Sequence, residues 1–290
     1  MADKLVRGNS MDGAIRVFAA VTTDLVNEAQ RIHHTYPVAT AALGRLLTGA
    51  AIMGAAGLKN ETDSMTVQIK GEGEITNLVA VTDCHSRVRG YVSNPYVDRP
   101  LNNKGKLDVG GGYLSVVRDL GLKEPYVGQI PLVSGEIAED LTYYYAKSEQ
   151  IPTSVALGVL VDTDNSVIAA GGFMIQLMPE ATEEMAVQLE DILKELPPVT
   201  TMIKEGMTAE DILFRVTEGF SMVCENKAVV PEYKCTCSKE RMEKALISIG
   251  KKELEELIED QGEAELTCQF CDNKYHFNKK ELEDLLEKAK

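Results

Sequence analysis

Hydrophobic and polar positions alternate weakly in short segments between positions 14 and 177, and this pattern predicts β-strands. The segment 14–21, rich in Ile, Val and Phe, is an example. The turn at 162–165, which contains Asp and Asn, joins two such segments and predicts a hairpin. The predicted strands are 14–21, 64–70, 75–83, 88–92, 113–119, 126–132, 154–161 and 167–177.

Helices are expected at 24–36, 38–58 and 137–149, with a loop at 94–112. The segment 38–58 is apolar enough to raise the question of a membrane span, but it is dominated by Ala and Gly and carries Arg45 near its middle. We therefore expect a helix buried on most sides within the protein core. Strands paired through short turns, with helices grouped rather than alternating, predict an α+β domain over residues 1–178.

The character of the sequence changes over residues 179–230. An amphipathic helix is expected at 182–196, ended by Pro197-Pro198, and a second helix at 209–218, capped by Thr208. The apolar stripe of the first helix consists of Met185, Leu189, Ile192 and Leu196. These helices have too little mass to form a core alone, so we expect a helical linker that docks on another part of the chain.

The charge of the chain argues against binding to nucleic acid. The formal net charge is −15, and no run of Lys or Arg forms a basic patch. The N-terminal sequence MADKLVRGNSMDGAIRVF has no apolar core of a signal peptide, so we expect a cytoplasmic protein without a membrane partner. In that compartment closely spaced cysteines stay reduced, which favours metal binding or redox chemistry over structural disulfides.

Four of the 6 cysteines form two tight pairs near the C-terminus, as Cys235-Thr-Cys237 and Cys268-Gln-Phe-Cys271. A C-x-C and a C-x-x-C motif can bring four thiolates to the corners of a tetrahedron, the geometry of structural Zn²⁺ sites. Four sulfur ligands close the coordination shell, so a reactive metal-bound water is not expected. His276 remains an alternative ligand. We expect one Zn²⁺ per chain in a small domain at 231–290, with helices at 239–247, 251–261 and 280–288.

A domain of about sixty residues has a marginal hydrophobic core. Metal ligation can supply about 10–16 kcal/mol of apparent free energy at neutral pH, so removing the metal should unfold the domain. Oxidation has the same effect, because a disulfide sulfur is a poorer ligand than a thiolate. Within each motif the two cysteines are close enough in sequence to join, although the single-residue spacer strains a Cys235–Cys237 ring.

Two other functions remain open for these cysteines. A thioredoxin-like oxidoreductase would use Cys268 and Cys271, but it needs a βαβ context that the sequence does not predict. A zinc-ribbon adaptor would instead bind a partner through a permanently folded C-terminal domain. No acid–base constellation stands out elsewhere, so we do not expect an enzyme. His33-His34 is expected to be structural, and Gly110–Gly112 a loop rather than a phosphate site.

Cys84 and Cys224 lie in apolar sequence surroundings, and each lacks a nearby cysteine, so we expect inert core thiols. The adjacent His85 does not make Cys84 a nucleophile. Ser148-Glu149-Gln150 is expected to cap the preceding helix rather than to act in catalysis.

With these motifs in view, the chain closely resembles the bacterial redox-regulated holdase chaperones, the thirty-three-kilodalton heat-shock protein family. The most specific mark of the resemblance is the C-x-C, long spacer, C-x-x-C pattern at the C-terminus. The stretches Val88-Arg89-Gly90-Tyr91-Val92 and Tyr145-Ala146-Lys147-Ser148-Glu149-Gln150-Ile151-Pro152 also resemble the family, so the resemblance covers the whole chain.

The resemblance implies an ATP-independent chaperone that is inactive while reduced and zinc-bound. Oxidation would then join Cys235 to Cys237 and Cys268 to Cys271, release the zinc, unfold the C-terminal domain and disorder the linker. The exposed apolar surface would hold unfolding client proteins under oxidative and heat stress. The resemblance also implies that the activated form is a homodimer.

Overall fold

The computed structural model describes residues 2–97 and 111–289. The chain forms two compact units, Met1–Lys234 and Cys235–Lys290, which we call the body and the tail unit. The predicted loop at 94–112 falls largely on residues 98–110, outside the described part of the chain. The structure thus groups the predicted linker with the body, on which it docks. Whether residues 179–230 also behave as a separate, detachable segment stays a prediction.

The body contains two β-sheets that differ in strand number and in strand direction. The first has the order β10-β1-β2-β9-β8 and is antiparallel throughout. The second has the order β11-β5-β4-β3-β6-β7, in which only the β11–β5 pair is parallel. The strands of the first sheet are β1 (Lys4–Ser10), β2 (Ile15–Val21), β8 (Thr153–Val161), β9 (Val167–Leu177) and β10 (Met222–Cys224). Those of the second are β3 (Ser64–Gly71), β4 (Asn77–Asp83), β5 (Arg87–Val92), β6 (Gly112–Asp119), β7 (Tyr126–Pro131) and β11 (Glu232–Tyr233).

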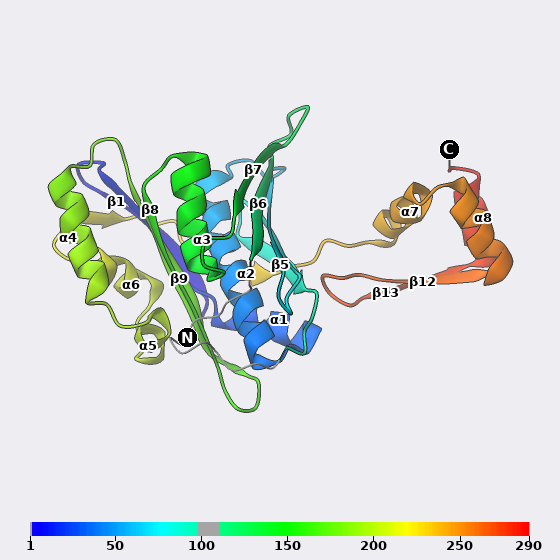
Figure 1. The fold of residues 1–290 in the computed structure, drawn as a ribbon, viewed down its shortest axis with the longest axis horizontal. Helices are drawn as coiled ribbons and strands as arrows, with labels where there is room; N and C mark the ends of the chain where they lie inside the picture. Colours follow the sequence, from blue (N-terminus) through cyan, green and yellow to red (C-terminus); the bar gives the residue numbers. More distant parts are fainter. Residues whose placement is uncertain (1, 98–110, 290) are drawn as a thin grey trace. The chain divides into compact units, whose positions relative to one another are not determined.

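Helix α2 (Pro37–Gly57) packs against both sheets, with α1 (Thr23–His33) and α3 (Ile137–Tyr144) beside it (Figure 1). It is the one helix among the described residues that is long and apolar enough to cross a membrane, but 89% of its apolar window is buried inside the fold. Its small residues let neighbours approach: a Cβ atom at Gly44 would lie 2.5 Å from Cγ1 of Val26. The expectation of a buried core helix is confirmed.

The helices of the predicted linker cover the other face of the first sheet, opposite α2 and α3 (Figure 1). They are α4 (Glu183–Lys194), α5 (Val199–Lys204) and α6 (Ala209–Val216). Since side chains alternate between the two faces of a strand, Val17 and Ala19 of β2 pack in the cluster of linker residues, while Phe18 and Ala20 belong to the cluster around α2. The docking surface that the sequence required is therefore this sheet.

Most details of the linker agree with its predicted pattern. The Thr208 side chain caps α6 in a reciprocal capping box with Asp211. Met185, Leu189 and Leu196 pack against the sheet, but Ile192 does not: it lines an open surface groove with Val187 and Gln188, and Leu193 packs inward in its place. The assignment of Ile192 to the buried stripe was wrong because the helix rotates this residue away from the sheet.

The tail unit consists of three helices and a hairpin. These are α7 (Lys239–Ser248), α8 (Lys251–Asp260), β12 (Glu263–Thr267), β13 (Lys274–Asn278) and α9 (Lys279–Leu286). Its hydrophobic cluster has six buried members, namely Leu246, Leu254, Ile258, Phe277, Leu282 and Leu285. This is a small core, as the sequence predicted, and together the two units confirm the α+β fold class.

Candidate metal centre

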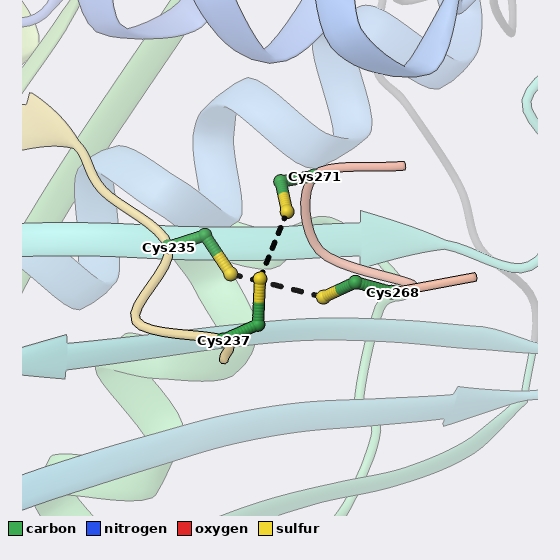
Figure 2. A group of neighbouring side chains, drawn as sticks. All are labelled: Cys235, Cys237, Cys268 and Cys271. Carbon is green, nitrogen blue, oxygen red and sulfur yellow. Dashed lines mark hydrogen bonds between the residues drawn. The ribbon is translucent and has the colours of Figure 1, made fainter. Parts of the chain in front are cut away.

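Four cysteine sulfurs from two loops of the tail unit converge on one point (Figure 2). Cys235 and Cys237 lie in the loop that leads into α7, and Cys268 and Cys271 lie at the tip of the β12–β13 hairpin. All four Sγ atoms lie within 4.8 Å of one another. Two of the contacts cross between the loops, with Sγ–Sγ distances of 3.8 Å for Cys235–Cys268 and 3.3 Å for Cys237–Cys271.

Backbone hydrogen bonds shape the hairpin loop. The N–H group of Cys268 donates to the carbonyl oxygen of Asn273 at 2.9 Å, and the N–H group of Asp272 donates to that of Cys268 at 2.9 Å. Asp272 adopts the left-handed conformation, with φ of 56°. This tight turn places Cys268 and Cys271 on the same side of the loop, with their sulfurs directed toward the first pair (Figure 2).

The first pair is held by the start of α7. The side chain of Ser238 caps this helix by accepting from the N–H group of Arg241 at 3.4 Å. The Arg241 guanidinium then reaches back and donates to Oγ1 of Thr236, between the two cysteines, at 2.8 Å. These contacts fix the loop even though it has no regular secondary structure of its own.

Four converging sulfurs could hold a metal ion in tetrahedral geometry. A Zn–S bond of about 2.3 Å places two sulfurs of a regular tetrahedron about 3.8 Å apart. The Cys235–Cys268 distance of 3.8 Å matches this value, whereas the Cys237–Cys271 distance of 3.3 Å is shorter. The set contains only soft sulfur donors. His276 is not part of the cluster, since its Nε2 atom lies 3.1 Å from a carboxylate oxygen of Glu265. The four-cysteine group therefore forms without His276, and the ligand set stays a prediction.

Burial and hydrogen bonding separate the thiol pKa values of the cluster. Burial raises the pKa of Cys235 and raises that of Cys271 further. Burial also acts on Cys237, but hydrogen bonds from Tyr275 and from the other cysteines outweigh it and lower the pKa of Cys237 to about 7. Cys237 therefore becomes a thiolate more readily than Cys235 or Cys271, and the thiolate is the form that binds metal and reacts with oxidants.

Comparison with known proteins identifies the family of the chain. The family model described as Hsp33 protein matches residues 3–278. The chain belongs to the Hsp33 family. Relatives named 33 kDa chaperonin include those of Clostridium beijerinckii, 49% identical over 100% of both chains, and Ruminiclostridium cellulolyticum, 50% identical over 99% of this chain and 98% of the relative. The crystal structure of the Thermotoga maritima 33 kDa chaperonin, HSP33, matches with a TM-score of 0.90 and 40% identity, covering 99% of this chain and 98% of that one.

The cysteines of this Hsp33 family member are all free thiols in the structure. Disulfide pairing of Cys235 with Cys237 and of Cys268 with Cys271 stays a prediction. All four sulfurs already lie within 4.8 Å, so any pairing needs only local movement of the two loops.

Cys84 and Cys224 lie in the body and outside this cluster. Each is half-buried and packs against a hydrophobic cluster, so the prediction of core thiols was only partly correct. Burial raises the pKa of both thiols, which agrees with low reactivity.

Two further predictions concerned polar residues of the body. The predicted cap at 148–150 is confirmed at Gln150, which ends the helix in the left-handed conformation and donates its N–H group to the carbonyl oxygen of Tyr145, whereas Glu149 has a different role. It accepts hydrogen bonds from Arg118 at 2.6 and 2.7 Å and from the phenol of Tyr144 at 2.6 Å, and it ends a π-helical turn, η1 (Tyr145–Glu149). His33 has a defined structural partner, the phenol of Tyr233, at 3.0 Å.

Sequence reasoning missed two tyrosines of this Hsp33 family member. The Tyr275 phenol donates to Sγ of Cys237 at 3.1 Å, and the Tyr233 phenol donates to the carbonyl oxygen of Gly90 at 2.7 Å. Tyr275 lies close in sequence to the predicted metal ligand Cys271, which was the only available signal. Nothing in the sequence around Tyr233 pointed to its role.

Proposed function

We propose that the protein is a redox-regulated, ATP-independent holdase chaperone of the Hsp33 family, cytoplasmic and not an enzyme. It is inactive while the four cysteines hold Zn²⁺ and is activated by their oxidation. The observation that carries this proposal is the convergence of four free thiols in a small unit that follows directly on the docked linker. The family membership and the names of the relatives, 33 kDa chaperonin, supply the chaperone assignment.

Bound Zn²⁺ would act as a structural cross-link between the two cysteine loops. The chemistry of activation would be thiol oxidation. Two thiolates, two protons and one hydrogen peroxide give one disulfide and two waters, so two peroxides convert all four ligands. We expect the pairs Cys235–Cys237 and Cys268–Cys271. Disulfide formation removes the negative charge that binds the cation, and the tail unit then loses the cross-link on which its six-residue core depends.

The linker gives this loss a route to the body. Residues of α4, α5 and α6 form one side of the hydrophobic cluster on the first sheet. They include the fully buried Met202, Ile212 and Leu213. If unfolding of the tail unit releases these helices, both their apolar faces and the sheet face beneath them meet solvent. A large exposed apolar surface of this kind suits a partner that is itself an unfolding protein.

The decisive experiment follows zinc and client aggregation in the same sample. Reduced, zinc-loaded protein is treated with peroxide at elevated temperature, and released zinc is measured with a chromogenic chelator. Light scattering then reports aggregation of a heat-labile test enzyme. We expect release of one zinc per chain together with suppressed aggregation, without ATP.

A variant with Cys84→Ser and Cys224→Ser serves as the control and should respond like the original protein. Zinc release without client holding would contradict the proposal. Oxidation that destroys rather than creates binding would favour the zinc-ribbon adaptor, and turnover of small disulfides would favour the oxidoreductase. Size-exclusion chromatography of the oxidised sample tests the expected homodimer.

A further inference from the structure

Within the part of the chain that the structure describes, the edge strand of the second sheet is β11, formed by two residues of the segment that precedes the metal ligands. Strand β11 pairs in parallel with β5, with Glu232 opposite Arg87 and Tyr233 opposite Val88. The N–H group of Lys234 donates to the carbonyl oxygen of Val88 at 2.8 Å. The remaining residues of β5, from Arg89 to Val92, have no β11 residue opposite them.

The side chain of Tyr233 occupies the next pairing position. Main-chain groups of alternate strand residues face the same edge, so Gly90 follows Val88 as the next residue available to a neighbouring strand. The Tyr233 phenol donates to the carbonyl oxygen of Gly90 at 2.7 Å and accepts from its N–H group at 3.3 Å. One hydroxyl therefore takes the place of the main-chain groups that a longer strand would supply.

His33, at the end of α1, completes the environment of this hydroxyl. Its Nε2 atom lies 3.0 Å from the Tyr233 oxygen, and the two rings meet edge to face with centroids 6.2 Å apart. The single phenol proton is used toward Gly90, so Nε2 of His33 acts as a donor. The ring of Tyr233 is partly buried against the main hydrophobic cluster. We call Val88, Gly90 and His33 the tyrosine socket.

The occupant of the socket is joined to the metal centre by a single residue. Tyr233 is followed by Lys234 and then by the ligand Cys235. A two-residue parallel strand is weak by itself, and beyond the Lys234–Val88 hydrogen bond its C-terminal end continues into the loop that carries the cysteines. When that loop is released, the segment is free to leave the socket and the β5 edge.

We propose that the tyrosine socket and the adjoining edge of β5 bind an extended segment of an unfolded client protein, with a tyrosine in the place of Tyr233. This inference rests on the proposed holdase function and specifies one of its binding sites. Recognition through main-chain groups tolerates many sequences, which suits a binder of unfolded chains. The phenol is the one side-chain feature that the socket selects.

The residues on either side of β11 favour a client segment, rather than a second copy of this chain, as the occupant of the socket. On one side β11 is preceded by Pro231, which has no N–H group to donate. On the other side Cys235 and Cys237 would lie opposite the rest of β5, and the expected disulfide between them is incompatible with an extended strand. A second copy carries both Pro231 and this disulfide, whereas a client segment can place a tyrosine phenol on Gly90 without either of them beside it.

The test uses the full-length oxidised protein and fluorescein-labelled hexapeptides. The probe is Thr-Val-Tyr-Val-Thr-Lys, compared with the same peptide carrying Phe instead of Tyr, and binding is measured by fluorescence anisotropy. We expect the tyrosine peptide to bind about tenfold more tightly than the phenylalanine peptide, because the phenol hydrogen bonds are lost in the latter. His33→Ala should remove this preference, His33→Gln should retain it because its amide N–H still donates, and His85→Ala should have no effect.

A second variant empties the socket without oxidation. Tyr233→Ala leaves all six cysteines in place, so the reduced protein should retain its zinc yet bind the tyrosine peptide, which the reduced original protein should not. If the oxidised original protein prevents aggregation but binds both peptides equally, the socket proposal is overturned and the holdase function stands. If the oxidised protein prevents no aggregation at all, both the proposed holdase function and the proposed binding of a client at the socket are overturned. A dimer that forms on oxidation, disappears in Tyr233→Ala and is unaffected by the peptide would assign the socket to a second copy instead.

Discussion

The phenol of Tyr275 on β13 donates a hydrogen bond of 3.1 Å to Sγ of Cys237, in the loop before α7. This contact joins the hairpin that carries one pair of cysteines to the loop that carries the other. It also raises the pKa of the phenol itself to about 12, because the hydrogen bond to Cys237 holds its proton. Outer groups of this kind orient metal ligands and tune their basicity.

Removing this hydroxyl should weaken metal binding. In Tyr275→Phe the pKa of Cys237 should rise from about 7 toward the ordinary thiol value of 9.0, so protons compete with the metal at higher pH. We expect zinc affinity at pH 7 to fall by about ten- to a hundredfold, measured by competition with a chromogenic chelator. Tyr113→Phe, at an exposed tyrosine of the body, is the matched control. Unchanged affinity in Tyr275→Phe would show that the hydrogen bond does not support the site.

Removal of the metal from the reduced protein should unfold the tail unit alone. Ligation supplies about 10–16 kcal/mol of apparent free energy, whereas the tail-unit core contains six buried residues. With excess zinc chelator and a reductant, we expect loss of the circular-dichroism signal of α7, α8 and α9, and rapid proteolysis beyond Lys234. The body should stay resistant under the same conditions.

Adding zinc back should restore both signals, which separates metal loss from irreversible damage. A chelated tail unit that stays as helical and as protease-resistant as the loaded one would remove the basis of the proposed switch.

The docking of α6 on the first sheet can be weakened without touching the metal centre. Ile212 is 0% exposed and packs in the linker cluster, so Ile212→Ala should cost about 2–5 kcal/mol of docking free energy. We expect faster proteolysis of the linker and stronger binding of a hydrophobic dye in the reduced protein, with unchanged zinc content. Client holding should appear before oxidation, if release of the linker creates the binding surface.

The same helix provides the control for this experiment. Phe214 is 47% exposed, and Phe214→Ala should leave linker proteolysis and dye binding nearly unchanged. Equal effects of the two substitutions would indicate that helix content, rather than docking, controls the linker.

Local patterns in the sequence predicted the elements that depend on local features. The buried helix α2, the β8–β9 hairpin and the capped helix α6 each have a recognisable composition or turn. The spacing of the four cysteines alone predicted that they could form a metal site. Strands β10 and β11, of three and two residues, were missed because their extended conformation comes from pairing with β1 and β5. The short helix α5 and the first strand β1 were also missed.

The roles of individual side chains depend still more on distant parts of the chain. Tyr275 lies 38 residues from Cys237, and Tyr233 lies 143 residues from Gly90. The N-terminus of α1 likewise depends on a residue distant in sequence, since Thr22 at the N-cap makes no side-chain cap hydrogen bond. The carboxylate of Asp3 accepts from the N–H groups of Asp24 and Leu25, at 3.0 and 2.8 Å. No sequence window contains both partners of any of these contacts.

Asp3 gives the body a pH dependence of unusual sign. Its side chain is buried, and burial raises its pKa from 3.8 to about 6 despite the two hydrogen bonds from α1. The folded state therefore binds more protons than the unfolded state between about pH 4 and pH 6. The stabilising contribution of protonated Asp3 is fully present below pH 4 and is lost as the pH rises through about 6.

The substitution Asp3→Asn should remove this dependence, because the amide does not ionise and its oxygen can still accept from α1. Relative to the original protein, the variant should gain up to about 3 kcal/mol of unfolding free energy between pH 4 and pH 7. Urea unfolding of both metal-free proteins across this pH range, followed through the signal of the body, measures the difference in unfolding free energy. Effects common to both proteins cancel in this difference. Asp12→Asn is a control of opposite sign, since the hydrogen bond from Ser10 lowers the pKa of Asp12. If the stability curves of Asp3→Asn and the original protein run parallel, ionised Asp3 costs the fold nothing, and its carboxylate is only a cap for α1.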